Sequence, residues 1–69
     1  MKEIAIGSEM IELGKFLKFS GIAQSGGQAK MWIEQGLVSV NGQPETRRRK
    51  KLVPGDTVAY EGQTMRVAP

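Results

Sequence analysis

The chain has 69 residues, which suits one small domain with a limited core and leaves no room for a second. It contains no cysteine and no histidine, so disulfides, thiolate or imidazole metal sites, a thiol nucleophile and a histidine general base are excluded. We therefore expect a single domain over residues 1–69 that uses no metal and no cofactor.

Membrane segments and export signals are not evident in the sequence. No apolar run approaches the roughly 18 residues that a membrane span requires. The start of the chain, Met-Lys-Glu-Ile, lacks the apolar core of a signal peptide. These features, with the absence of cysteine, favour a cytoplasmic protein with no membrane partner.

The net charge of +3 is unevenly distributed along the chain. In residues 1–36 four lysines cancel four glutamates, whereas residues 37–69 carry six cations against three carboxylates. Five of these cations are consecutive, from Arg47 to Lys51, in a segment with too few apolar residues to be buried. This asymmetry indicates an anionic partner.

The first half of the chain predicts a strand and two helices. Apolar residues alternate over residues 2–6, as in a short strand. From about residue 12 to residue 20 a helix is expected, because Leu13, Phe16 and Leu17 fall at i, i+3 and i+4 on one face. Four residues later a second helix is expected to begin, so the two helices should form a compact hairpin.

Ser25 is suited to cap the second helix, since its hydroxyl can accept from a free N–H three residues on. Gln28 stands where a capping-box partner reaches back to the cap residue. Gly36 is expected to end the helix, because a residue past a helix end often adopts a left-handed conformation. The apolar stripe of this helix, which we assign to the core, consists of Ala29, Trp32 and Ile33.

Strands dominate the predicted second half. Residues 37–40 are rich in β-branched side chains, and the Asn41-Gly42 pair that follows is a strong hairpin signal. Pro44 has no N–H to donate, so the returning strand should be short or at an edge, after which the basic run leaves the sheet. Two further strands are expected over residues 57–60 and 64–67.

Catalysis is poorly supported by the sequence. The seven carboxylates are scattered among cations, and none has the flanking apolar residues that would raise its pKa, so we expect a non-enzyme. The Gly26-Gly27 pair lacks the spacing of a nucleotide-binding loop. Two interpretations of the pair remain open. The free backbone N–H groups at this helix start could hold one phosphate of a nucleic-acid backbone, or the glycines could let the first helix or a loop pack closely against the second helix.

The basic run is interpreted as a nucleic-acid contact in preference to a solvated loop, because five adjacent like charges repel one another unless a polyanion offsets the repulsion. Lys15 and Lys18 project from one side of the first helix and extend the same surface. Base stacking is disfavoured, since most of the four aromatic residues are needed by the core: Phe16, Phe19, Trp32 and Tyr60.

Four ordered motifs resemble the small RNA-binding domain named after ribosomal small-subunit protein S4, and in particular its stand-alone bacterial members. The resemblance covers nearly the whole chain through residues 11–18, 25–30, 40–42 and 45–48. The chain departs from many members at Gly26, where those carry an arginine, and at the start of the first helix.

The resemblance implies an α+β fold, with two short helices packed on a small, mostly antiparallel sheet of four to five strands. It also implies a non-catalytic monomer that binds structured RNA, ribosomal or transfer RNA, through a basic face, in ribosome assembly or translation. Structured RNA hides its base edges, which suits recognition through phosphates and shape. On this sequence the predicted RNA-binding residues are Lys15, Lys18, Ser25, Lys30, Asn41, Gly42, Arg47, Arg48, Arg49, Lys50 and Lys51.

Two alternative functions are kept. Two short helices joined by a glycine-containing link match the outline of a helix-turn-helix DNA binder, although the outer face of the second helix lacks a row of base-reading groups. A protein-protein adaptor that docks on a ribosomal or other protein is the second alternative, and its binding would survive high salt.

Overall fold

The computed structural model describes residues 1–69 and contains two α-helices and seven short β-strands. In chain order these are β1 (Lys2–Ala5), β2 (Ile11–Glu12), α1 (Leu13–Phe19), α2 (Gly26–Glu34), β3 (Val38–Val40), β4 (Gln43–Pro44), β5 (Lys51–Leu52), β6 (Thr57–Tyr60) and β7 (Gln63–Ala68). Each helix lies within one or two residues of its predicted bounds, and β6 matches its predicted range. No helix is both long and apolar enough to cross a membrane.

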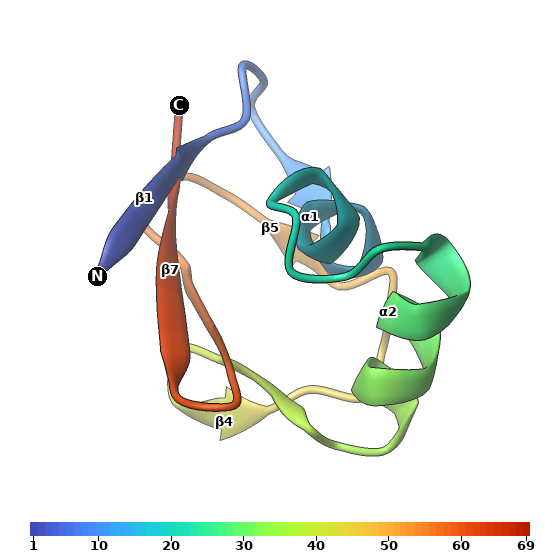
Figure 1. The fold of residues 1–69 in the computed structure, drawn as a ribbon. Helices are drawn as coiled ribbons and strands as arrows, with labels where there is room; N and C mark the ends of the chain where they lie inside the picture. Colours follow the sequence, from blue (N-terminus) through green and yellow to red (C-terminus); the bar gives the residue numbers. More distant parts are fainter.

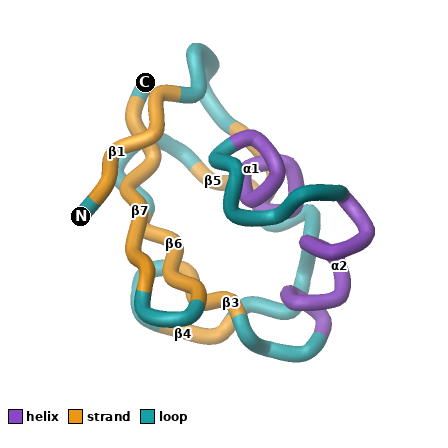
Figure 2. Tube along the Cα trace, in the orientation of Figure 1, coloured by secondary structure: helices purple, strands orange, loops and turns teal.

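Five strands form one sheet in the order β1-β7-β6-β3-β4, and the helices face it from the other side of the molecule (Figures 1 and 2). The pair β1 and β7 is parallel, and the other three pairs are antiparallel. The expected α+β fold with a mostly antiparallel sheet of four to five strands is therefore confirmed. β4, which contains Pro44, is two residues long and lies at the edge, as its missing N–H requires.

A second sheet of two strands was not expected. β2 pairs antiparallel with β5, so that Ile11 is opposite Leu52 and Glu12 is opposite Lys51. The basic run therefore does not lie wholly outside regular structure, since its last residue, Lys51, belongs to β5. Strands of two residues show no periodicity, so only the contact between distant parts of the chain reveals them.

The core lies between the helices and the larger sheet and is made of twelve buried residues, all of them apolar. Trp32 packs against it without entering it: the ring is half-buried and stacks on Tyr60, with centroids 4.2 Å apart and planes 15° apart. Of the four aromatic residues, Phe16 is fully buried and Trp32 and Tyr60 are partly buried against the core, so most of them contribute to it as expected. Phe19, at the end of α1, is 59% exposed.

The start of α2 is capped as predicted, with one difference. The Ser25 hydroxyl accepts from the N–H of Gln28 at 3.1 Å. The side-chain oxygen of Gln28 instead accepts from the N–H of Gln24 at 2.9 Å, one residue earlier than the capping box predicts. Beyond the helix Gly36 adopts a φ of 76°, the left-handed conformation expected of it.

The turn between β3 and β4 has the predicted hairpin geometry, since Asn41 and Gly42 have φ values of 51° and 84°. The Asn41 side chain also joins this turn to the start of β6. Its amide nitrogen donates to an Asp56 carboxylate oxygen at 3.0 Å, and its oxygen accepts from the Thr57 N–H at 2.9 Å. Asn41 therefore connects two turns that are distant in sequence.

Candidate nucleic-acid interface

The segment between β4 and β5, residues 45–50, is called the basic loop here, and it is fixed to α1 by backbone hydrogen bonds. The first N–H groups of a helix have no partner within the helix. In α1 the N–H of Leu13 donates to the Lys50 carbonyl at 2.8 Å, and that of Gly14 donates to the Arg48 carbonyl at 2.9 Å. The basic loop thus satisfies the first turn of α1 and is held against it.

Gly14 lies in close contact with the basic loop. A Cβ at this position would lie 3.4 Å from the carbonyl oxygen of Arg48 and 3.5 Å from its Cβ. A methyl group at this position would thus touch the loop backbone at van der Waals distance. A glycine inside a helical pattern is a sequence signal of such a packing contact.

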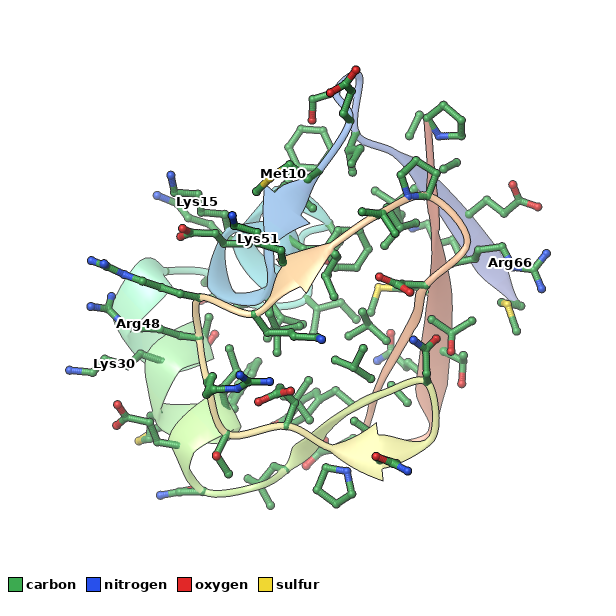
Figure 3. The ribbon with its side chains drawn as sticks, turned by 180° about the vertical axis from the view of Figure 1, so that it is seen from behind. Met10, Lys15, Lys30, Arg48, Lys51 and Arg66 are labelled. Atoms are coloured by element: carbon green, nitrogen blue, oxygen red, sulfur yellow. The ribbon has the colours of Figure 1, made fainter.

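Three elements meet around an open hollow of about 550 Å³, called the basic hollow here. α1 contributes two lysines, α2 contributes its first residue and one lysine, and the basic loop contributes two arginines. Its lining residues are Glu12, Gly14, Lys15, Lys18, Gly26, Lys30, Arg48 and Arg49. Figure 3 shows the side chains of Lys15, Lys30 and Arg48 extending from the same side of the molecule, with Arg66 of β7 on the opposite side.

The five cations of the basic hollow form no ion pair with the protein. The single ion pair of the structure joins Arg47 to Glu45, and the hollow contains only one carboxylate, that of Glu12. Three of the cations come from helices and two from a loop more than fifteen residues later in the sequence. Uncompensated like charges brought together in this way create a local positive potential that attracts an anion.

A second hollow of about 630 Å³, the loop hollow, lies along the other side of the basic loop. Arg48 and Arg49 line both hollows and so separate them. The lining residues of the loop hollow are Glu34, Thr46, Arg47, Arg48, Arg49, Lys50 and Lys51. The carboxylate of Glu34 in this hollow makes no ion pair.

Arg47 differs from its neighbours in having a partner. Its Nε donates to one oxygen of the Glu45 carboxylate at 3.0 Å, and its terminal nitrogen donates to the other oxygen at 3.3 Å. The backbone N–H of Arg47 donates to the same carboxylate at 3.0 Å. These hydrogen bonds lower the pKa of Glu45 from its usual 4.5 to about 2, and the same pair raises the pKa of Arg47.

The structure thus gathers most, but not all, of the predicted RNA-binding residues. Lys15, Lys18, Lys30 and all five residues of the basic run line one of the two hollows. Ser25, Asn41 and Gly42 line neither, and the side chains of Ser25 and Asn41 already bond within the protein. The role of each of these residues in RNA binding stays a prediction.

The acidic side chains do not gather at one place in the fold. No three His, Cys, Asp or Glu residues cluster in a way that could hold a metal ion. The lowered pKa of Glu45 follows from its hydrogen bonds with Arg47.

The chain matches the S4 domain family over residues 4–68. It is 49% identical over 59 residues to a Bacillus subtilis protein named "Probable ribosome maturation protein RlbA", covering 86% of this chain and 83% of that protein. It is 46% identical over 57 residues to the Escherichia coli protein named "Putative RNA-binding protein YbcJ", covering 83% of this chain and 81% of that protein.

Two solved structures of S4-like proteins have the same fold as this chain. The solution structure of YbcJ from Escherichia coli, reported to contain an alfaL motif involved in RNA-binding, matches with a TM-score of 0.75 and 40% identity, covering 100% of this chain and 89% of that one. The 30S ribosomal protein S4e from Thermoplasma acidophilum, at 19% identity, shares the fold with a TM-score of 0.65, over 86% of this chain and 31% of its own. The resemblance found in the sequence is confirmed, and the chain belongs to the S4 domain family.

Proposed function

We propose that this protein is a non-catalytic RNA-binding protein that contacts the phosphates of structured RNA through the basic hollow. The observation that carries the proposal is the convergence of five unpaired cations, from α1, α2 and the basic loop, on one hollow. The names of the two relatives, one RNA-binding and one a ribosome maturation protein, support the same function.

Structured RNA suits this surface better than single-stranded RNA does. A-form RNA exposes phosphates and 2′-hydroxyls over a wide shallow groove, and these are read by cations and by shape. The basic hollow offers five cations and no aromatic side chain on which bases could stack. We therefore propose ribosomal or transfer RNA as the ligand, and ribosome maturation or translation as the process.

Fluorescence anisotropy of a labelled RNA hairpin, titrated with the protein over a salt series, tests this function. Each cation that neutralises a phosphate contributes a slope of roughly 0.7 to 0.9 in log K against log salt. We expect Lys30→Ala and Arg49→Ala to weaken binding and each to reduce this slope by about that amount. A DNA duplex of the same length should bind more weakly than the hairpin.

Arg66→Ala is the matched control, because it removes the same charge from the opposite side of the molecule (Figure 3). If Arg66→Ala weakens binding as much as Arg49→Ala, the net charge and not the basic hollow binds the RNA. Equal affinity for hairpin and DNA duplex would favour the DNA-binding alternative. Absence of RNA binding by the wild-type protein would favour an adaptor that docks on another protein.

A further inference from the structure

The basic loop contains one cation that is already neutralised. Both carboxylate oxygens of Glu45 accept from the Arg47 guanidinium, at 3.0 and 3.3 Å, and one of them also accepts from the Arg47 backbone N–H. The Glu45 side chain is 15% exposed, whereas that of Arg47 is 71% exposed. Of the five consecutive cations, Arg47 is thus the one with an internal partner, and we call its pairing with Glu45 the loop clasp.

The loop clasp lies between two anchors of the basic loop. On one side the N–H of Glu45 donates to the Val38 carbonyl at 2.9 Å, which ties the start of the loop to β3. On the other side the Arg48 carbonyl accepts from Gly14 of α1. The residues between these anchors connect the sheet to the helix, and the loop clasp lies among them.

We propose that Glu45 and Arg47 are positioning residues, whose pairing holds the basic loop so that Arg48 and Arg49 are placed at the RNA-binding hollow. This inference rests on the proposed function and changes the predicted role of Arg47 from an RNA contact to a support. A loop that is ordered before binding loses less conformational entropy on binding, so its cations bind a phosphate more tightly.

The chemistry of the pair argues against a direct role for Arg47. Its guanidinium uses Nε and one terminal nitrogen on the carboxylate, so the edge best suited to bidentate phosphate binding is occupied. A phosphate that displaced Glu45 would leave an unpaired carboxylate close to the RNA. The pair as a whole carries no net charge and therefore adds no net attraction for RNA.

The direction in which Glu45→Ala changes the RNA affinity distinguishes a positioning role of Glu45 from a purely electrostatic one. Removing a carboxylate near a bound polyanion raises the local positive charge, so a purely electrostatic role for Glu45 predicts tighter binding in Glu45→Ala. A positioning role predicts weaker binding. Glu34 is a matched control, because its carboxylate lines the loop hollow, next to the same cations, and makes no ion pair.

Anisotropy titrations with the RNA hairpin should show opposite effects of the two glutamate variants. We expect Glu45→Ala to weaken binding about threefold to tenfold, the effect of ordering one or two loop side chains. Glu34→Ala should tighten binding by about twofold at low salt, an effect that disappears at high salt. Glu45→Gln, which can still accept hydrogen bonds, should recover part of the loss.

Arg47→Ala and the double variant Glu45→Ala/Arg47→Ala test the role of the arginine. We expect the double variant to weaken binding without changing the salt slope, because it removes one charge of each sign, and to bind no more weakly than Arg47→Ala, which leaves the Glu45 carboxylate unpaired. If Glu45→Ala tightens binding as Glu34→Ala does, or if the double variant lowers the slope by about 0.7 to 0.9, Arg47 is a phosphate contact and the inference is overturned.

A measurement on the free protein separates the loop clasp from RNA binding itself. Amide hydrogen exchange at Gly14 reports whether its bond to the Arg48 carbonyl is kept. Exchange at Gly14 should accelerate in Glu45→Ala and stay unchanged in Glu34→Ala. If exchange at Gly14 is unchanged in both variants, the positioning role is overturned even though the protein binds RNA. If the wild-type protein does not bind the RNA hairpin, the proposed function is overturned instead.

Discussion

The amide of Gly14 donates a 2.9 Å hydrogen bond to the carbonyl oxygen of Arg48, which joins the first turn of α1 to the basic loop. A Cβ at position 14 would lie 3.4 Å from that oxygen, so a methyl group there would be in ordinary van der Waals contact with the loop backbone. One backbone hydrogen bond therefore links a helix start to the arginine that separates the basic hollow from the loop hollow.

We expect Gly14→Val to force the basic loop away from α1. The two γ-carbons would overlap the Arg48 backbone, and overpacking of this kind typically costs about 1–3 kcal/mol of unfolding free energy. Urea unfolding measures this loss, and hairpin anisotropy should show weaker binding because Arg48 is displaced.

Gly14→Ala is the control for that variant, since its methyl group would only touch the Arg48 carbonyl at van der Waals distance. The alanine variant should keep both the stability and the RNA affinity of the wild type. Equal behaviour of Gly14→Val and Gly14→Ala would show that the loop does not depend on the close approach.

Asn41→Gly should reduce stability and leave RNA affinity unchanged. Glycine accepts the φ of 51° at this position but cannot bond to Asp56 and Thr57. Loss of these exposed hydrogen bonds is expected to cost about 1–2 kcal/mol, measured by urea unfolding. Because Asn41 does not line either hollow, a clear fall in hairpin affinity would instead establish it as an RNA contact.

The hydrogen bonds of Arg47 make stability depend on pH through Glu45. The pKa of Glu45 is about 2 in the folded protein against its usual 4.5, so its pairing stabilises the fold above pH 4.5. That stabilisation is lost as the pH falls from 4.5 towards 2, because protonation of the carboxylate ends the ion pair.

Thermal unfolding of Glu45→Gln across this pH range provides the measurement. The variant should unfold at a lower temperature than the wild type near pH 6, and the difference should shrink as the pH falls from 4.5 towards 2. A difference that is constant with pH would mean that the Glu45 charge does not contribute to stability.

Gly27→Ala should stabilise the protein. Gly27 lies in the first turn of α2, and a Cβ there would meet no atom within 4 Å. Replacing glycine by alanine in a helix gains about 0.5–1 kcal/mol when nothing clashes. A rise in the urea midpoint checks this, and a fall would show that the glycine conformation is needed by the fold.

Local features of this protein were predictable from its sequence. The cap at Ser25, the end of α2 at Gly36, the hairpin turn at Asn41 and the strand over residues 57–60 all lie at or close to their predicted places. Each depends on residues that are close together in the sequence, where hydrogen-bond geometry and allowed φ values decide the conformation. The resemblance to the S4 domain added the fold class.

Only the tertiary structure decided which strands pair and which cations form the basic hollow. The parallel contact of β1 with β7 and the pairing of β2 with β5 join segments about forty or more residues apart, for which no local pattern exists. The folded chain also brings Arg48 beside Lys15 and Lys30. The basic run is visible in the sequence, but which of its cations share a hollow with the helix lysines follows only from the tertiary structure, because these residues are distant in sequence and meet only in space.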